Sequence, residues 1–284
     1  MDRRRLMAAL AATTTFPALA RAQDLTMASS AVPLSIQGRL IQGGVAIGRT
    51  APGAHISLDG EAVTEADPQG WFVIGFDRDA PEQQQLSVAA GPDIVGDILV
   101  IQPAEFDIQR INGLPRNQVA PADPDLLARI RAEAARKAEG FASLAPRSDF
   151  LTGFAMPLTN FRMTGRFGGQ RILNGVPARP HYGVDLAAPT GEPVLAPAGG
   201  RVSFAETGLH YEGGLIMIDH GQGLVSAYLH LSRVAVAAGD EVSQGQVIGA
   251  VGAEGRATGP HLCWRMKWRN RNLNPMALVG LRTA

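Results

Sequence analysis

The sequence predicts a mostly β protein, with a small N-terminal β-sandwich, a linker helix and a C-terminal antiparallel β-sheet domain. Three observations support this prediction. Short apolar segments alternate with turn signals such as Asp59-Gly60 in the first third of the chain, and Asp-Gly between alternating segments is typical of hairpins. A single alanine-rich stretch carries helix-capping residues. Glycine-rich strand patterns then return from about residue 150, and a length of 284 residues fits two domains.

Residues 1–22 are predicted to be a cleaved export signal. Arg3–Arg5 form a basic start, a weakly apolar stretch follows, and Ala20-Arg21-Ala22 fits a small-x-small cleavage site. The stretch is too short and polar for a membrane anchor, which needs about 20 apolar residues, so no integral membrane segment is expected in the mature chain. The run Asp2–Met7 resembles a twin-arginine signal, with a plain secretory signal as the alternative. Either route predicts the periplasm or cell envelope.

The expected sandwich covers residues 31–105. Evenly spaced short strands separated by turns are typical of such a fold. His55 stands alone there, so no catalytic constellation is expected. The formal net charge of zero and the 6% aromatic content argue against nucleic acid as a partner. The expected strands are 34–36, 54–58, 71–76, 86–89 and 94–101.

Residues 106–149 are predicted to form a connector with a helix at 124–139. Asp123 is placed as the N-cap, Pro124 takes the first helical position and Gly140 ends the helix.

Two further features of this helix follow from its sequence. Glu133 and Lys137 have the i,i+4 spacing of an ion pair. Leu127, Ile130 and Ala134 form a thin apolar stripe. The stripe predicts a helix that lies on a domain surface or joins two domains; a regulatory helix that covers a site is the alternative.

Residues 150–284 are predicted to form an antiparallel β domain, and the candidate chemistry concentrates in it. His181 and Asp185 lie four residues apart at the start of a strand, and His230 ends another. His261 and Cys263 are two apart in a strand and therefore point to one face. The expected strands are 194–196, 200–206, 215–219, 224–230, 241–242, 246–251 and 261–268.

These residue types favour a catalytic zinc site with one Zn²⁺ per chain. Such a site uses three protein ligands and leaves a position open for water, and His181, Asp185 and Cys263 supply three competent donors. His230 and His261 remain to take or give a proton near the bound water. Zinc would lower the pKa of that water and polarise a scissile carbonyl.

The region from about Gly165 to Met276 resembles the lysostaphin-type, LytM-like peptidoglycan metallopeptidases of metallopeptidase family 23. The resemblance implies a compact antiparallel sheet with a groove, His181 and Asp185 as zinc ligands, and His230 and His261 as catalytic residues. The motifs that carry it are Gly165–Gly168, His181–Ala188, Ile218–Gly221, Tyr228–Leu231, Gly239-Asp240 with Gly245–Gly249, and Thr258–Leu262.

Cys263 departs from the family pattern, in which a second histidine of a His-x-His element is the third ligand. In one interpretation Cys263 binds zinc as a thiolate. In the other the site is decaying and the domain no longer cleaves. We favour the first, because a competent ligand replaces a ligand while four partner residues remain. The first also explains a lone cysteine in an exported chain.

Two functions therefore stay open. The first is a zinc endopeptidase that hydrolyses peptide cross-links of peptidoglycan, with stem peptides or cross-bridges as substrate. The second is a catalytically silent module that binds peptidoglycan or activates a cell-wall amidase partner. Arg166, Arg171 and Arg179, in the loop before His181, are candidates to meet substrate carboxylates; the alternative is that water solvates them.

Overall fold

The structure is a computed structural model that describes residues 23–27 and 32–281. The predicted export signal, residues 1–22, lies outside the described residues. Among the described helices, none is both long and apolar enough to cross a bilayer.

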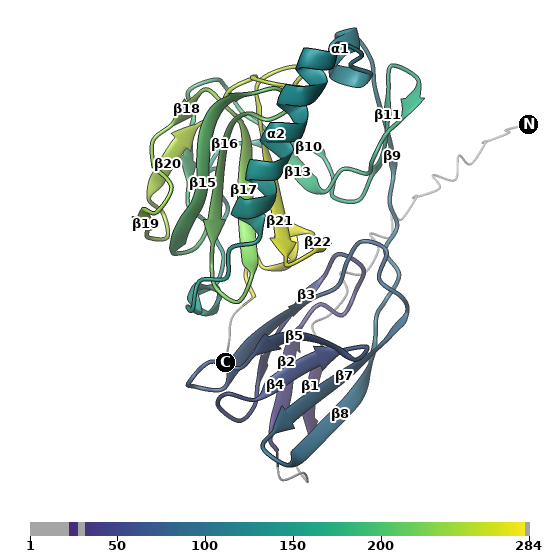
Figure 1. The fold of residues 1–284 in the computed structure, drawn as a ribbon, viewed down its shortest axis with the longest axis vertical. Coiled ribbons are helices and arrows are strands. Elements are labelled where there is room, and N and C mark those ends of the chain that lie inside the picture. The colour runs from purple at the N-terminus through teal and green to yellow at the C-terminus, as the bar shows by residue number, and fades with distance from the viewer. Residues whose placement is uncertain (1–22, 28–31, 282–284) are drawn as a thin grey trace, which may run out of the picture.

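The N-terminal strands form two four-stranded antiparallel sheets, in the lower half of Figure 1. Their side chains alternate between inside and outside; in β7, for example, Leu86 and Val88 are buried while Gln85 is exposed. The first sheet has the order β1-β2-β3-β6 and the second the order β5-β4-β7-β8. The strands are β1 (Gln23–Met27), β2 (Leu34–Gly38), β3 (Val45–Arg49), β4 (His55–Leu58), β5 (Glu61–Glu65), β6 (Trp71–Gly75), β7 (Gln83–Ala90) and β8 (Asp93–Val100). The sequence-based expectation missed β1, β3 and β5.

The connector holds more structure than the sequence predicted. It contains β9 (Ile108–Ile111), a short helix α1 (Arg116–Val119), the long helix α2 (Pro124–Phe141) and a 3-10 turn η1 (Asp149–Thr152). The side chain of Asp123 caps α2 by accepting a hydrogen bond from the amide of Asp125, and Pro124 opens the helix.

Three expectations for α2 were wrong. The helix does not end at Gly140 but continues to Phe141, because Gly140 packs against the sheet, where an added Cβ would lie 2.9 Å from Phe204 Cβ. Glu133 pairs with Arg129 and Lys137 pairs with Glu212, so the predicted Glu133–Lys137 pair does not form. The buried residues of α2 are Glu133 and Gly140, whereas Ala134 of the predicted stripe is exposed.

The C-terminal region is built around one eight-stranded sheet with the order β10-β13-β21-β17-β16-β15-β19 and β22 paired to β21. Two three-stranded sheets, β12-β11-β9 and β14-β20-β18, lie beside it. The mostly β, antiparallel prediction is confirmed. The elements are β10 (Arg162–Gly165), β11 (Gln170–Leu173), β12 (Val176–Pro177), β13 (Gly183–Ala187), β14 (Pro193–Leu195), β15 (Gly200–Leu209), β16 (Gly213–Asp219), β17 (Leu224–Leu231), β18 (Arg233–Val234), β19 (Glu241–Val242), β20 (Val247–Ala250), β21 (His261–Trp268), β22 (Arg271–Leu273) and η2 (Pro275–Ala277).

The two faces of the large sheet pack against different partners. Trp264 and Trp268 of β21 point into the main core, which is continuous with the N-terminal sheets. Cys263, which alternates with them, belongs to a smaller core that Phe141 of α2 closes. Helix α2 therefore lies on the face of the sheet that carries Cys263, and Figure 1 shows it running in front of β15, β16 and β17.

Candidate metal centre

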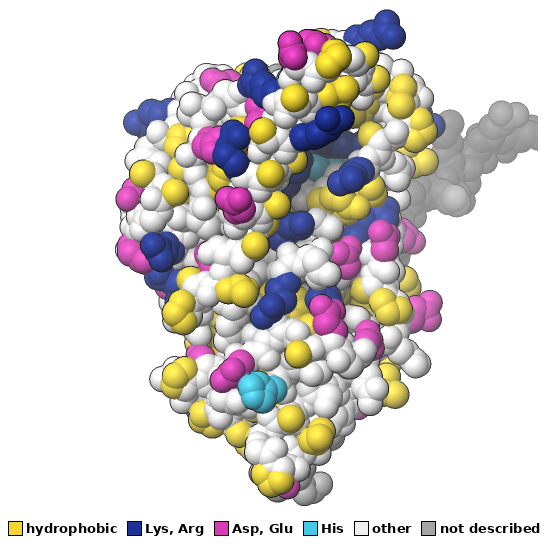
Figure 2. Space-filling model, viewed as in Figure 1, with side chains coloured by type: hydrophobic (Ala, Val, Ile, Leu, Met, Phe, Trp, Pro, Cys, Tyr) yellow, Lys and Arg dark blue, Asp and Glu magenta, His cyan; other side chains and the backbone are white. Residues whose placement is uncertain are grey.

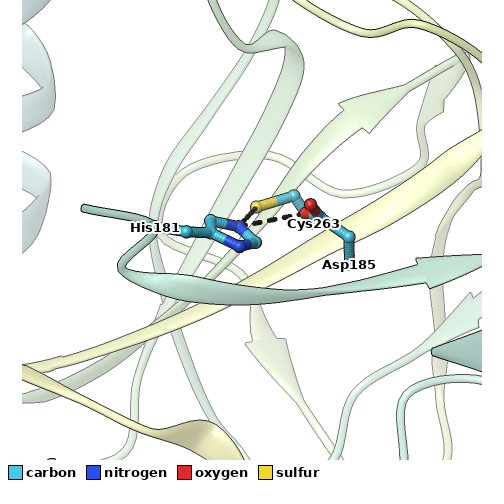
Figure 3. A group of neighbouring side chains, drawn as sticks. All are labelled: His181, Asp185 and Cys263. Carbon is cyan, nitrogen blue, oxygen red and sulfur yellow. Dashed lines mark hydrogen bonds and ion pairs between the residues drawn. The ribbon is translucent and has the colours of Figure 1, made fainter. Parts of the chain in front are cut away.

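Three potential metal ligands converge at one end of the large sheet (Figure 3). His181, Asp185 and Cys263 each offer a donor atom, and these atoms lie within 4.8 Å of one another. His181 Nε2 lies 3.0 Å from Asp185 Oδ1 and 3.3 Å from Cys263 Sγ. His181 and Cys263 are buried, and the Asp185 side chain is 14% exposed.

Strand register brings two of these residues together. Asp185 of β13 lies directly opposite Cys263 of β21, so both side chains project from the same face. Gly165 makes room for the carboxylate, since a Cβ there would lie 2.5 Å from Asp185 Oδ2.

The backbone of His181 is held before β13 begins. Its amide donates to Gly169 O at 2.8 Å and its carbonyl accepts from the amide of Gly168 at 2.7 Å. Gly168 has a φ of 84°, which few other residues adopt. The Gly165–Gly168 motif thus leaves space for the Asp185 carboxylate and fixes the backbone of His181.

His230 and His261 flank this cluster with their rings 4.7 Å apart, centroid to centroid. Nδ1 of His230 donates to Glu254 O at 2.8 Å, and Nδ1 of His261 donates to Gly259 O at 2.8 Å. A carbonyl only accepts, so in the neutral ring Nε2 carries the lone pair. Nε2 of His261 lies 3.7 Å from Asp185 Oδ1.

The orientation of His230 depends on unusual backbone geometry. Leu229 lies opposite Cys263, so simple alternation along β17 would send His230 to the other face. His230 has a φ of 67°, in the left-handed region, and this breaks the alternation. Its amide donates to Glu212 O at 2.8 Å, which holds the distorted backbone in place.

Burial controls the charge states of the cluster. It lowers the pKa of His181 to about 4 and that of His230 to about 3. Burial alone would raise the pKa of Asp185, but its hydrogen bond with His181 and the charge of Arg171 outweigh this and hold that pKa well below the usual range. At neutral pH the neutral imidazoles of His181 and His230 therefore lie beside an ionised Asp185 carboxylate. Burial raises the pKa of the Cys263 thiol to about 11.

The donors fit a metal ion. Imidazole nitrogen, carboxylate oxygen and cysteine sulfur are the ligand types that Zn²⁺ takes. Buried Asp185 Oδ1 contacts His181 Nε2 at 3.0 Å and has no further hydrogen-bond partner among the described residues, as expected of an atom that also faces a cation. Nδ1 of His181 also lacks a protein partner, so the carbonyl or carboxylate that usually orients a metal-bound histidine is absent among the described residues.

The comparisons with known proteins agree with this arrangement. The family model "Peptidase family M23" matches residues 179–275. This segment contains the three candidate ligands and the two flanking histidines, His230 and His261. Residues 179–275 are therefore similar to peptidase family M23.

Curated relatives match less than half of the chain. Identity to peptidoglycan DD-endopeptidase ShyA of Vibrio cholerae is 40% over 121 residues, which cover 42% of this chain and 27% of ShyA. Identity to the DD-carboxypeptidase/endopeptidase Mpg of Neisseria meningitidis is 38% over 123 residues, or 43% of this chain and 28% of that protein. The chain thus matches little more than a quarter of the length of these relatives.

A solved structure extends the likeness beyond the M23 domain. A crystal structure described as a peptidase M23 from Pseudomonas aeruginosa superposes with a TM-score of 0.65 and 27% identity. The superposition covers 85% of this chain and 96% of that one.

The connector covers the cluster of the M23 domain. Strand β9 pairs in parallel with β11, and Asn174 holds Leu114 through two hydrogen bonds, from Leu114 N at 3.2 Å and to Leu114 O at 2.7 Å. Ile111 and Leu114 line a cavity of about 50 Å³ together with Asp185, His230 and His261. We call residues 108–114 the roof of the site.

Sequence reasoning misplaced one residue near the site and missed others. Arg171 was a candidate to bind substrate, but its Nη2 donates to Asp185 Oδ2 at 2.8 Å and it belongs to the cluster itself. Arg265 could have been found, because it continues the alternation of His261 and Cys263 along β21. No sequence signal indicates the roof.

The other three histidines lie outside the metal centre. His220, in the turn after β16, is buried and hydrogen-bonded at both ring nitrogens, to Gly199 O at 2.6 Å and Ser226 Oγ at 2.7 Å. His210 binds the connector, since its Nε2 lies 3.1 Å from Asn117 O. His55 is 72% exposed in its side chain and lies in the N-terminal sheets.

Proposed function

We propose that the protein is a zinc-dependent endopeptidase that hydrolyses peptide cross-links of bacterial peptidoglycan. The observation that carries this proposal is the convergence of three zinc-competent donors with two histidines whose Nε2 atoms are free of backbone hydrogen bonds. The names of the curated relatives support the substrate, because they include peptidoglycan DD-endopeptidases. Such a substrate implies action in the cell envelope.

In this proposal His181, Asp185 and Cys263 hold one zinc ion, with Cys263 as a thiolate. The ion, when bound, supplies Lewis acidity toward the scissile carbonyl and the attacking water. Arg171 holds the second carboxylate oxygen of Asp185, which keeps Oδ1 turned toward His181. The buried position of Cys263 shields its sulfur from oxidants in solution.

His230 and His261 act as the proton carriers in this proposal. Each ring is fixed by an Nδ1–H hydrogen bond to a backbone carbonyl, so Nε2 is presented to the reaction. One ring accepts the proton of the attacking water, and one returns a proton to the amine that leaves.

One observation favours the second candidate function, a silent peptidoglycan-binding or amidase-activating module. The roof leaves about 50 Å³ between itself and His230, too little for a peptide at that point, although a separate space of about 480 Å³ reaches Asp185 and His261. In an endopeptidase the roof would have to shift for a peptide to reach His230. In a silent module it would stay closed.

Metal analysis combined with digestion of purified cross-linked muropeptides separates the two functions. We expect about one zinc per chain and cleavage by the natural protein, loss of both in His181→Ala, and loss of cleavage alone in His261→Ala. His55→Ala is the matched control, because His55 is exposed and remote. Absence of zinc after reconstitution under reducing conditions, with peptidoglycan binding retained, would establish the silent module instead.

A further inference from the structure

A cavity with basic walls lies beside the metal centre. Its volume is about 730 Å³, and it is enclosed by α2, the segment around β11, the loop that carries Tyr211, and β21. Figure 2 shows Lys and Arg side chains around a hollow beside α2, with a histidine visible in its depth. We call this space the basic cavity. Its cationic lining residues are Arg171, Arg179, Arg256, Arg265 and Lys267, and no Asp or Glu lines it.

Four of the five cations that line the basic cavity have no ion pair with the described part of the protein. Among the described residues, no carboxylate lies within ion-pair distance of Arg179, Arg256, Arg265 or Lys267. The cations on the neighbouring surface of α2 differ, since Arg136 pairs with Glu206 and Lys137 with Glu212. Of the five cationic lining residues, Arg171 alone pairs with a described carboxylate, that of Asp185.

Two buried donors in this cavity also lack partners. The Nε atoms of Arg171 and Arg265 are shielded from solvent, yet neither forms a hydrogen bond with a described residue. A buried, unsatisfied donor of a charged group is costly. Burial and the neighbouring arginines lower the pKa of Arg256, and burial lowers that of Lys267. An anion in the cavity would relieve both costs.

We propose that the basic cavity binds carboxylate groups of an acidic peptide that is the substrate of the metal centre. This inference rests on the proposed function, because it names a feature of that substrate. Guanidinium groups match a planar carboxylate with paired hydrogen bonds. Apolar and aromatic side chains on the same walls, including Ile130, Phe141 and Tyr211, suit the methylene groups of peptide side chains.

Two arginines connect the cavity to the metal centre. Arg171 lines the cavity and at the same time binds Asp185. Arg265 lies two residues after Cys263 on the same face of β21. A carboxylate held by these arginines would therefore lie within a few side-chain lengths of the bond to be cleaved, and the enzyme would distinguish peptides with free carboxylates from amidated peptides.

Binding of two fluorescently labelled peptides tests the inference. The probes are a cross-linked stem-peptide dimer with free carboxylates and the same dimer with every carboxylate amidated. Fluorescence anisotropy is measured with His261→Ala protein, so that hydrolysis does not consume the probe. We expect the free-carboxylate dimer to bind at least about tenfold more tightly, as charge-assisted hydrogen bonds require.

Two substitutions locate the preference. Arg179→Gln changes an exposed rim residue, and Lys267→Met removes a charge that lies over the Phe141 ring. Each should weaken binding of the free-carboxylate dimer about tenfold and that of the amidated dimer less than about twofold. Lys267→Arg should restore the preference, and Arg131→Gln, on the exposed side of α2, should leave it unchanged. Thermal unfolding of each variant checks that it folds.

The outcomes separate this inference from the proposed function. A carboxylate preference without cleavage by the natural protein would keep the basic cavity and overturn the endopeptidase. Cleavage of both dimers by the natural protein, together with equal binding of both dimers by His261→Ala, would keep the endopeptidase and overturn the basic cavity. Equal weakening of both dimers by Arg179→Gln and Lys267→Met would also overturn the inference, because it would indicate a general structural effect.

Discussion

Two regions of the large sheet bury histidines, and they use the ring nitrogens differently. Next to the turn after β16, both nitrogens of His220 are hydrogen-bonded, to Gly199 and Ser226. At the metal centre, His230 and His261 each bind a carbonyl through Nδ1 and leave Nε2 to the site. All three imidazoles have limited exposure to water, so burial does not distinguish them. The number of hydrogen-bonded ring nitrogens distinguishes them: both in His220, which is structural, and one in His230 and His261, which are available for chemistry.

The largest expected effect comes from removing a metal ligand. Cys263→Ala should abolish stoichiometric zinc and hydrolysis, because only two protein donors remain. Cys263→His should retain zinc, since it restores the family's His-x-His pattern, although the larger side chain in a packed core costs about 1–3 kcal/mol of stability. Elemental analysis after dialysis checks both variants. Full zinc occupancy in Cys263→Ala would remove Cys263 from the ligand set.

The next effect tests the free Nε2 atoms directly. His230→Ala and His261→Ala should keep zinc but lower hydrolysis of cross-linked muropeptides by about 10²- to 10⁴-fold, the usual contribution of a proton carrier. His220→Asn should cleave at the natural rate, provided that it is assayed well below its unfolding temperature. A comparable loss of rate in folded His220→Asn would break the distinction between the two regions.

His220 should instead affect stability as a function of pH. Burial lowers its pKa to about 4, from 6.5 in the unfolded chain. Between these values the unfolded state binds more protons, so stability falls as the pH falls from 6.5 to 4. The difference of about 2.5 units corresponds to about 3 kcal/mol. Urea unfolding across this range should show a flatter pH dependence for His220→Asn, and parallel curves would contradict the prediction.

The smallest expected effect concerns the roof. Asn174→Gly removes the two side-chain hydrogen bonds to Leu114, and glycine tolerates the φ of 48° at this position. Loss of about 1–2 kcal/mol of local stability should raise hydrolysis of a short peptide several-fold if closure of the roof limits access. His220 lies outside the cavity under the roof, so the pH dependence of global stability that His220 causes should be the same in Asn174→Gly. An unchanged rate would mean that the roof opens without breaking these bonds.

Most strands of the fold were predictable because they depend on local alternation. The segment 261–268 was predicted at its observed bounds, and Asp123 was predicted as the N-cap of α2. The end of α2 was not, because close packing of Gly140 against Phe204 and Met217 outweighs the usual helix-ending preference of glycine. Strand β5 was missed because its Glu61-Ala62-Val63-Thr64-Glu65 sequence has a single buried apolar residue.

The sequence by itself determined the types of donor and their spacing: a histidine and an aspartate four apart, and a histidine and a cysteine two apart along one strand. These are local properties, set by side-chain chemistry and by the two-residue period of a strand. Tertiary structure alone decided that His230 turns toward the cluster, through a φ of 67°, and that Arg171 binds Asp185. It also placed the roof over the site, because the pairing of Leu114 with Asn174 joins residues 60 positions apart, and no local pattern encodes that contact.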